Sequence, residues 1–277
     1  MAPRAEKKSN FFPGFLLLPR AKRSALSAVY AYCRLIDDIV DDGNIPKTEA
    51  RGQLDFWRAE VEGLYEGRAT HPISQALTGP IAEFNIPQEP FLEMIRGCAM
   101  DLEGTRYETI TDLESYMRGV ASSVGVMCVH IFGWDYTSHE HMMQFATDFG
   151  YAFQLTNIIR DVGADLELGR VYLPLADLRA AGYSMERLVA REPSEAFERM
   201  MRVQYKRAKD YYTRARERVD FRDRPRLLPA EVMAHVYEGL LDEIEDGDFR
   251  VLFQKTRLSV PRKAFLAVKA WFYCHGF

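Results

Sequence analysis

Acidic side chains gather at the end of a long helix-forming segment near the N-terminus. The sequence IDDIVDD places Asp37, Asp38, Asp41 and Asp42 in its last turns. A helix C-terminus carries about half a negative charge, so each carboxylate there costs roughly 0.3–1 kcal/mol. Asp37 and Asp41 are four residues apart and share one face, which suits oxygen ligation of Mg²⁺. The pattern therefore predicts a cation site.

The same face continues toward the start of this segment. Tyr30, Arg34, Asp37 and Asp41 follow one another at steps of four, three and four residues. Such steps place side chains in one stripe along a helix. The stripe would present a phenol, a guanidinium and two carboxylates to one ligand.

A second polar stripe lies far downstream in the chain. Gly150, Gln154, Asn157, Asp161 and Asp165 recur at steps of four, three, four and four residues. Most other positions of this segment are apolar, so solvation of a surface helix does not explain a line of amides and carboxylates there. We expect the second stripe to line a cavity and to face the first.

Taken alone, each cluster is equally well explained as a solvated surface patch. Together they are more informative, because Arg34, Arg160 and Arg170 lie close to them in sequence. Paired carboxylate clusters with nearby guanidinium groups are typical of sites where several Mg²⁺ ions bridge the protein to a diphosphate. Diphosphate chemistry is therefore the leading hypothesis.

Helices are predicted to position both clusters. Apolar residues recur at three- and four-residue steps over residues 20–42, 48–66, 112–132, 139–162, 195–219 and 229–246, whereas alternation with a period of two is almost absent. Long stretches without proline separate the turns. We predict a single all-α domain over residues 1–277, with about eight to ten helices and no linker.

Composition and charge limit the class of protein. The 277 residues are 47% hydrophobic and 27% charged, as in globular proteins. A net charge of −4 provides no basic field, so no nucleic-acid partner is expected. The four cysteines form no CxxC pair, which favours a reducing cytoplasm. No apolar run approaches the roughly 20 residues of a membrane span. We expect a cytoplasmic protein whose membrane contact, if it has one, is peripheral and at the inner face.

The C-terminal segment, residues 264–277, is the candidate for such a contact. Phe265, Leu266, Val268, Trp271 and Phe272 make an apolar face that Lys263 and Lys269 interrupt. This pattern suits a helix that lies at a membrane surface. A helix packed on the protein core is the alternative.

At the acidic clusters the chain resembles the squalene/phytoene synthase family, the head-to-head isoprenoid synthases. The segment YAYCRLIDDIVDD at 30–42 is similar to the family's first aspartate-rich motif, and QLTNIIRDVGADLELGRVYLP at 154–174 to its second. The resemblance extends over nearly the whole chain through FFPGFLLLP at 11–19, YMRGVASSVGVM at 116–127, VYEGLLDEIE and RLSVPRKAFL. One departure is Lys8-Ser9-Asn10-Phe11, where many members carry Ser-x-Ser-Phe.

The resemblance implies an isoprenoid-synthase helical bundle around a central cavity and a role for each matching residue. The implied ligands of about two or three Mg²⁺ ions are Asp37, Asp41, Asp161 and Asp165. Catalytic positions at the diphosphate, at its metal ions or at the reacting carbons are matched by Tyr30, Arg34, Tyr116, Asn157, Arg160 and Tyr237, with Asn157 beside the second pair of metal ligands. Substrate-binding positions are matched by Phe11, Val120, Ala121, Val124, Gly125, Gly150, Gln154 and Arg262.

The resemblance also implies an activity, that of a prenyltransferase. IIRDVGAD and MDLEGTRYET are most similar to bacterial presqualene diphosphate synthases of hopanoid biosynthesis. The leading hypothesis is therefore the Mg²⁺-dependent condensation of two farnesyl diphosphates to presqualene diphosphate with release of diphosphate, for which NADPH is not expected. Enzymes of the downstream squalene pathway are candidate partners.

Other activities stay open alongside this one. Phytoene or dehydrosqualene synthase and an NADPH-dependent squalene synthase are the enzymatic alternatives, and they leave a C15 or a C20 substrate open. A non-catalytic scaffold protein with the same helical fold is the alternative of another class.

Overall fold

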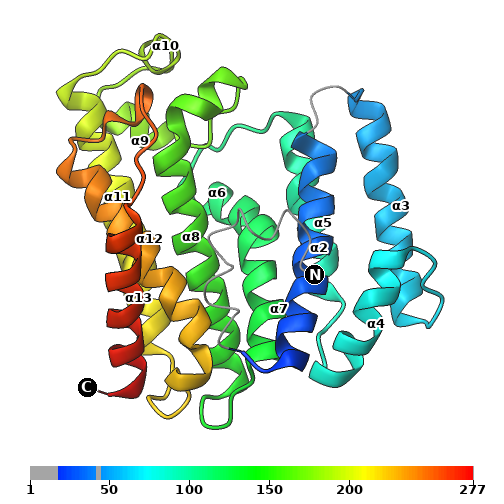
Figure 1. Ribbon diagram of the computed structural model, residues 1–277. Coiled ribbons are helices and arrows are strands. Elements are labelled where there is room, and N and C mark those ends of the chain that lie inside the picture. Colours follow the sequence, from blue (N-terminus) through cyan, green and yellow to red (C-terminus); the bar gives the residue numbers. More distant parts are fainter. Residues whose placement is uncertain (1–17, 42–44, 277) are drawn as a thin grey trace.

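The computed structural model describes residues 18–41 and 45–276. Within these two ranges every regular element is a helix, which confirms the all-α prediction (Figure 1). The residues Phe11 and Asp42, named above, lie outside the described residues. No described helix is both long and apolar enough to cross a membrane.

Most helices lie alongside one another and bury their apolar faces in one connected core. Their bounds, in chain order, are α2 (Arg20–Asp41), α3 (Lys47–Tyr65), α4 (Pro72–Phe84), α5 (Glu89–Glu103), α6 (Ile110–Met117), η2 (Arg118–Ser122), α7 (Ser123–Phe132), α8 (His139–Glu167), α9 (Leu175–Ala180), α10 (Met185–Val189), α11 (Glu195–Glu217), η3 (Arg224–Leu227), α12 (Leu228–Asp246), η4 (Arg250–Leu252) and α13 (Val260–His275).

The two helices that carry the acidic clusters, α2 and α8, both run upward in Figure 1. Along α2 the buried residues Leu26, Val29, Cys33 and Ile36 keep three- and four-residue spacing, as the sequence predicts. The side chain of Ser138 caps the start of α8 by accepting a hydrogen bond from a backbone N–H. Because α8 continues to Glu167, five residues past its predicted end, the whole second stripe lies on helix.

The helix predicted over residues 112–132 is interrupted by a turn of π-helix. This turn, η2, separates α6 from α7. It passes very close to its neighbours: a Cβ added at Gly119 would lie 2.5 Å from the Cα of Gly97, and one added at Gly150 would lie 2.4 Å from the Cα of Ser122. These glycines allow α5, η2 and α8 to pack backbone against backbone. Single π turns often occur at functional sites.

The C-terminal helix α13 packs on α12 through one face and exposes the other. Leu266, Ala270 and Cys274 are buried. Phe265 and Val268 are more than half exposed. The helix therefore packs on the protein core through the side that carries Leu266, and it also exposes other apolar residues to solvent, as a helix at a membrane surface would.

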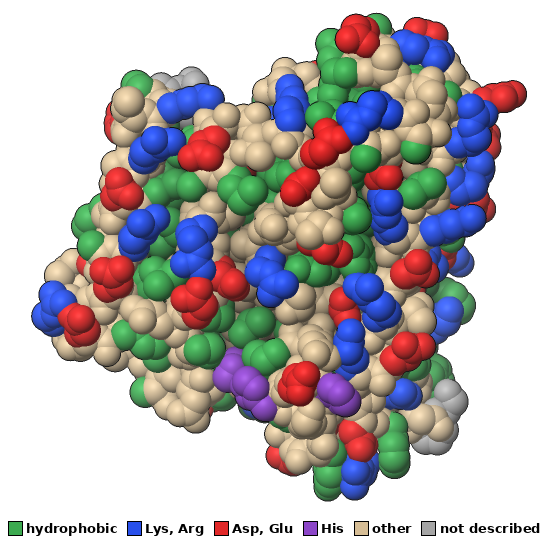
Figure 2. Space-filling model, turned by 180° about the vertical axis from the view of Figure 1, so that it is seen from behind, with side chains coloured by type: hydrophobic (Ala, Val, Ile, Leu, Met, Phe, Trp, Pro, Cys, Tyr) green, Lys and Arg blue, Asp and Glu red, His purple; other side chains and the backbone are tan. Residues whose placement is uncertain are grey.

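The molecular surface carries mixed charge. Figure 2 shows lysine and arginine side chains interspersed with aspartate and glutamate over the face behind the view of Figure 1. The long helix α11, for example, pairs Lys209 with Asp242 and Arg214 with Asp148. On this face the positive charges are therefore distributed among negative ones.

Candidate active site

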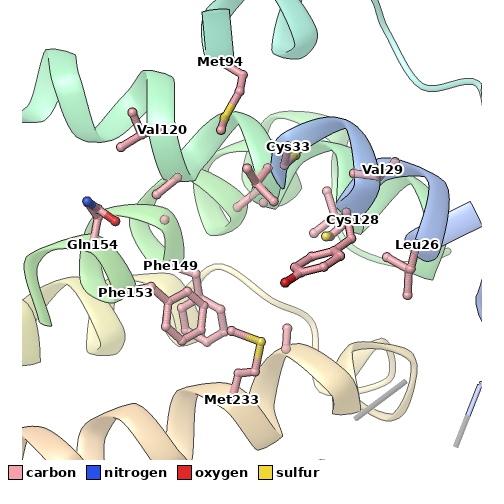
Figure 3. Close-up of a pocket in the computed structure, with 18 of the residues that line it drawn as sticks. Leu26, Val29, Cys33, Met94, Val120, Cys128, Phe149, Phe153, Gln154 and Met233 are labelled. Atoms are coloured by element: carbon pink, nitrogen blue, oxygen red, sulfur yellow. The ribbon is translucent and has the colours of Figure 1, made fainter. Parts of the chain in front are cut away.

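A cavity of about 360 Å³ lies between α2, η2, α7, α8 and α12. Its walls are largely apolar, and Figure 3 shows the side chains of Leu26, Cys128, Phe149, Phe153 and Met233 grouped around the open space. Aromatic contacts stiffen one wall, since the Phe149 and Phe153 ring centroids are 5.5 Å apart and Phe153 also meets Tyr237 at 5.3 Å. An enclosure of this kind suits a hydrocarbon chain.

The cavity is polar at one end only. Along α2 the lining residues run from Leu26 to Asp37, which is about 16 Å at 1.5 Å per residue. Along α8 they run from Phe145 to Asn157, or about 18 Å. Both acidic clusters therefore lie at the end of the cavity toward which α2 and α8 run, and the hydrocarbon-like part extends away from them.

Most residues implicated by the sequence line this one cavity. The lining residues among them are Tyr30, Arg34, Asp37, Tyr116, Val120, Ala121, Val124, Gly125, Gly150, Gln154, Asn157 and Tyr237. Asp41, Arg160, Asp161 and Asp165 lie further along the same two helices, next to the polar end. Arg262 lies apart from this group, exposed in the first turn of α13 with its guanidinium 5.8 Å from the ring of Phe265.

The first cluster consists of Asp37, Asp38 and Asp41 at the C-terminal end of α2. Arg34 lies 2.6 Å from Asp38 and 3.6 Å from Asp37. About half of the Asp37 side chain is exposed, yet desolvation at the cavity mouth and the negative charge of Asp41 raise its pKa to about 6. Arg170 donates a 2.8 Å hydrogen bond to Asp41 from the loop after α8. This loop therefore links the two clusters.

The second cluster consists of Asn157, Asp161 and Asp165 on α8. Burial alone would raise the pKa of Asp161, but hydrogen bonds and charge from Arg160 and Lys255 hold it below its ordinary value. The Lys255 Nζ lies 2.8 Å from Asp161 Oδ1. The pKa of Asp165 is shifted in the opposite direction from that of Asp161. Desolvation and the nearby charge of Asp161 raise this pKa to about 7.

The donor set at the polar end fits a hard cation. Carboxylate and amide oxygens are the ligands that Mg²⁺ prefers. The Oδ1 atom of Asn157 is buried with no hydrogen-bond partner, so it has lone pairs available to a cation or a donor on a ligand. Within residues 18–41 and 45–276, however, no three acidic, histidine or cysteine side chains converge as a metal-binding group.

Three polar residues near the clusters were not assigned a role from the sequence. Asp101 on α5 accepts hydrogen bonds from Tyr116 and Tyr172, and Lys255 pairs with Asp161. Asp101 and Tyr172 lie within segments that carry the family resemblance, which is the only sequence signal for them. Lys255 has no helical stripe or motif around it, so its position depends on the folded chain.

Comparison with protein families gives one match over most of the chain. Residues 4–264 match the family model described as squalene/phytoene synthase. Curated phytoene synthases are among the similar proteins. The 15-cis-phytoene synthase of Synechocystis sp. is 33% identical over 276 residues, which are 96% of this chain and 82% of that protein.

Solved structures of related enzymes have the same fold. A dehydrosqualene synthase crystallised with a ligand superposes with a TM-score of 0.86 at 28% identity, covering 98% of this chain and 94% of the other. A squalene synthase from Alicyclobacillus acidocaldarius superposes with a TM-score of 0.77 at 30% identity, covering 87% of this chain and 89% of the other. The central cavity is therefore set in the helical fold of isoprenoid synthases.

Proposed function

The chain belongs to the squalene/phytoene synthase family of head-to-head prenyltransferases, and from this premise we propose that it joins two molecules of geranylgeranyl diphosphate into phytoene. The observation that carries the proposal is the alignment of 96% of the chain with a phytoene synthase. This observation favours the C20 substrate over the farnesyl diphosphate that the motifs suggested.

A second candidate is the C15 reaction. It is supported by the likeness to a dehydrosqualene synthase and, at 30% identity, to a squalene synthase. Two farnesyl diphosphates would then give presqualene diphosphate, with dehydrosqualene or squalene as the final product. The cavity and both clusters would serve either chain length in the same way, because the chemistry would take place at the diphosphate end.

The residues at the polar end would bind and ionise an allylic diphosphate. Mg²⁺, when bound, would neutralise the leaving diphosphate, whose oxygens would complete the ligand sets of Asp37, Asp41, Asp161 and Asp165. Arg34 lines the cavity beside the first cluster and would contact the phosphates. The C–O bond would break with its electron pair on the diphosphate, which leaves an allylic cation in the cavity.

The apolar wall would protect that cation until the second substrate attacks. Its double bond would supply the electrons of the new C–C bond, and loss of a proton to the released diphosphate would close a cyclopropane ring. The cyclopropylcarbinyl diphosphate would then lose its own diphosphate, rearrange and give up a second proton to form the triene phytoene. The faces of Phe149 and Phe153 attract a cation and exclude water, which would otherwise capture it. Tyr116 and Tyr237 border the same space with polarisable rings.

A product assay tests the proposal. Purified protein receives geranylgeranyl and farnesyl diphosphate, separately and together, with Mg²⁺, with and without NADPH, and the extracted products are identified by mass spectrometry. We expect phytoene from the C20 substrate without NADPH. Products from farnesyl diphosphate alone would support the second candidate, and squalene formed only with NADPH would indicate a squalene synthase. No product under any condition would favour the scaffold protein.

We also propose that α13 holds the protein at a membrane surface. Val260, Phe265 and Val268 are 79%, 59% and 54% exposed. Arg262 and Lys269 are exposed on the same helix, which contains no acidic residue. An apolar face with flanking basic residues suits the interface of an anionic bilayer. Such a location would also bring the cavity close to its lipid-like substrate and product.

Co-sedimentation with anionic lipid vesicles tests this location. Changing Val260, Phe265 and Val268 together to Ser should abolish binding without altering the fold. A matched control changes three exposed apolar residues on other helices, Phe56, Val189 and Val203, to Ser. Equal binding of both triple variants would rule out α13 as the contact.

A further inference from the structure

A carboxylate outside both clusters holds the hydroxyl groups of two tyrosines. Asp101 Oδ2 accepts a 3.0 Å hydrogen bond from Tyr116 Oη, and Asp101 Oδ1 accepts a 2.8 Å hydrogen bond from Tyr172 Oη. Each carboxylate oxygen therefore has its own phenol. Hydrogen bonds to a charged acceptor are stronger than those between neutral groups, so this pair fixes the direction of both hydroxyls.

The two tyrosine rings are also fixed by stacking. The Tyr116 and Tyr172 centroids are 5.1 Å apart with planes inclined by 23°, and Tyr107 packs on both rings at 5.6 and 6.3 Å. All three rings are buried. The group leaves Tyr116 little freedom to rotate, because both its ring and its hydroxyl are held.

The Tyr116 ring is part of the cavity wall, whereas Asp101 and Tyr172 lie behind it. Tyr172 belongs to the loop after α8, and Arg170 of the same loop bonds Asp41 of the first cluster. Asp101 thereby joins the cavity wall to the segment that connects the two clusters. A change at Asp101 would alter the wall without removing any residue that lines it.

We propose that Asp101 is a positioning residue that holds the Tyr116 ring against the reacting carbons. A phenol that donates a hydrogen bond to a carboxylate has a more electron-rich oxygen and ring, and this increases its attraction for a cation. The inference rests on the proposed function, since the cation it concerns is the allylic cation of that reaction. A different role, in which Asp101 binds a metal ion directly, is the alternative that the experiment separates.

The experiment compares Asp101→Asn with Tyr116→Phe and with the double variant. Loss of the held geometry should lower kcat by about 10- to 100-fold, while KM changes much less. Because Asp101 acts through Tyr116, the double variant should be no slower than Tyr116→Phe alone. Tyr172→Phe, which keeps the carboxylate and the bond to Tyr116, should have a smaller effect. Additive losses in the double variant would overturn the proposal.

Two further measurements separate positioning from metal binding and from loss of structure. Calorimetric titration with Mg²⁺ and inorganic diphosphate should give wild-type affinity for Asp101→Asn, and a strong loss would make Asp101 a ligand instead. Near-ultraviolet circular dichroism should show the altered tyrosine group in Asp101→Asn and Tyr116→Phe alike. Asp177→Asn is the matched control, because Asp177 accepts hydrogen bonds from Gln204 and Arg207 away from the cavity and should affect stability alone.

Failure of the proposed function and failure of the positioning role give different results in these measurements. If wild-type protein forms no product, the proposed function fails, and the dichroism and titration then decide only whether Asp101 holds the Tyr116 ring and whether it binds metal. If wild-type protein forms product and Asp101→Asn matches its kcat, the positioning role fails while the proposed function stands.

Discussion

The two acidic clusters use the same residue type in opposite surroundings. The side chains of Asp37 and Asp41 are each 46% exposed at the end of α2, whereas the Asp161 side chain is 18% exposed within α8. Water and the half-exposed guanidinium of Arg34 can screen the first cluster. The second cluster depends on fixed partners, because Arg160 and Lys255 both contact Asp161. Removal of one carboxylate should therefore have different structural consequences in the two places.

The helical positions also differ. The first cluster opposes the negative end of its helix, which disfavours unliganded carboxylates. In the second cluster only Asp165 lies in the last turn of α8, with Asp161 one turn further in, and desolvation raises the pKa of Asp165 as it does that of Asp37. A bound cation would offset both desolvation and charge repulsion in each cluster.

The largest expected effect is the loss of turnover when either cluster is changed. Asp37→Asn and Asp161→Asn should each lower kcat by roughly 10³-fold, because each removes a charge that would bind the cation at the leaving group. Product formation under saturating Mg²⁺ measures this. Near-normal rates in both variants would contradict the assignment of either cluster to the active site.

The same two variants should differ in stability, which is the sharper part of the comparison. Asp161→Asn leaves Arg160 and Lys255 without their anionic partner and should cost about 1–3 kcal/mol. Asp37→Asn relieves repulsion with Asp41 and should be neutral or slightly stabilising. Thermal unfolding without Mg²⁺ measures both. Equal destabilisation would show that the clusters are not structurally distinct.

A smaller effect is expected from a substitution in the apolar wall of the cavity, which lies beside both clusters. Val124→Trp should narrow the cavity and lower turnover by about 10-fold, while binding of Mg²⁺ with inorganic diphosphate stays at the wild-type level. Gly125 is unsuitable for this test, since a Cβ there would lie 2.7 Å from the Ala146 carbonyl oxygen and would force α7 from α8. If Val124→Trp weakened diphosphate binding, the wall and the polar end would not be independent.

Sequence periodicity was sufficient to predict which side chains share a face wherever those side chains belong to a single helix. The steps between Tyr30, Arg34 and Asp37, and between Gln154 and Asn157, correctly predicted groups that face the same cavity. A helical stripe has this property because side-chain direction follows from the helix repeat alone. The all-α fold was predictable for the same reason.

Contacts between distant segments were not predictable in this way. Asp101 meets Tyr172 across 71 positions, and Lys255 meets Asp161 from a loop near the C-terminus. The π turn η2 also escaped prediction, because its apolar spacing resembles that of an α-helix. Its place depends on glycines such as Gly97 and Gly119, whose close approach appears only when two helices pack.

The smallest expected effect is a dependence of stability on pH that separates the clusters. Folding raises the pKa of Asp165 from 3.8 to about 7, so the native protein binds a proton more tightly than the unfolded chain does. The metal-free protein should therefore lose stability as the pH rises from about 4 to 7, by about 1–2 kcal/mol from this partly exposed and screened group. Thermal unfolding in the presence of a chelator measures the change.

Single substitutions assign this pH dependence to its source. Asp165→Asn cannot ionise, so it should remove most of the loss and leave the protein more stable than wild type above pH 7. Asp37→Asn should remove a smaller part that is complete by about pH 6, because the pKa of Asp37 is raised less and its carboxylate is more open to solvent. Saturating Mg²⁺ with diphosphate should flatten the wild-type profile, since ligation favours the ionised form of both groups. A wild-type profile that is already flat without metal would show that the second cluster has no desolvation cost, and the contrast between enclosed and open clusters would fail.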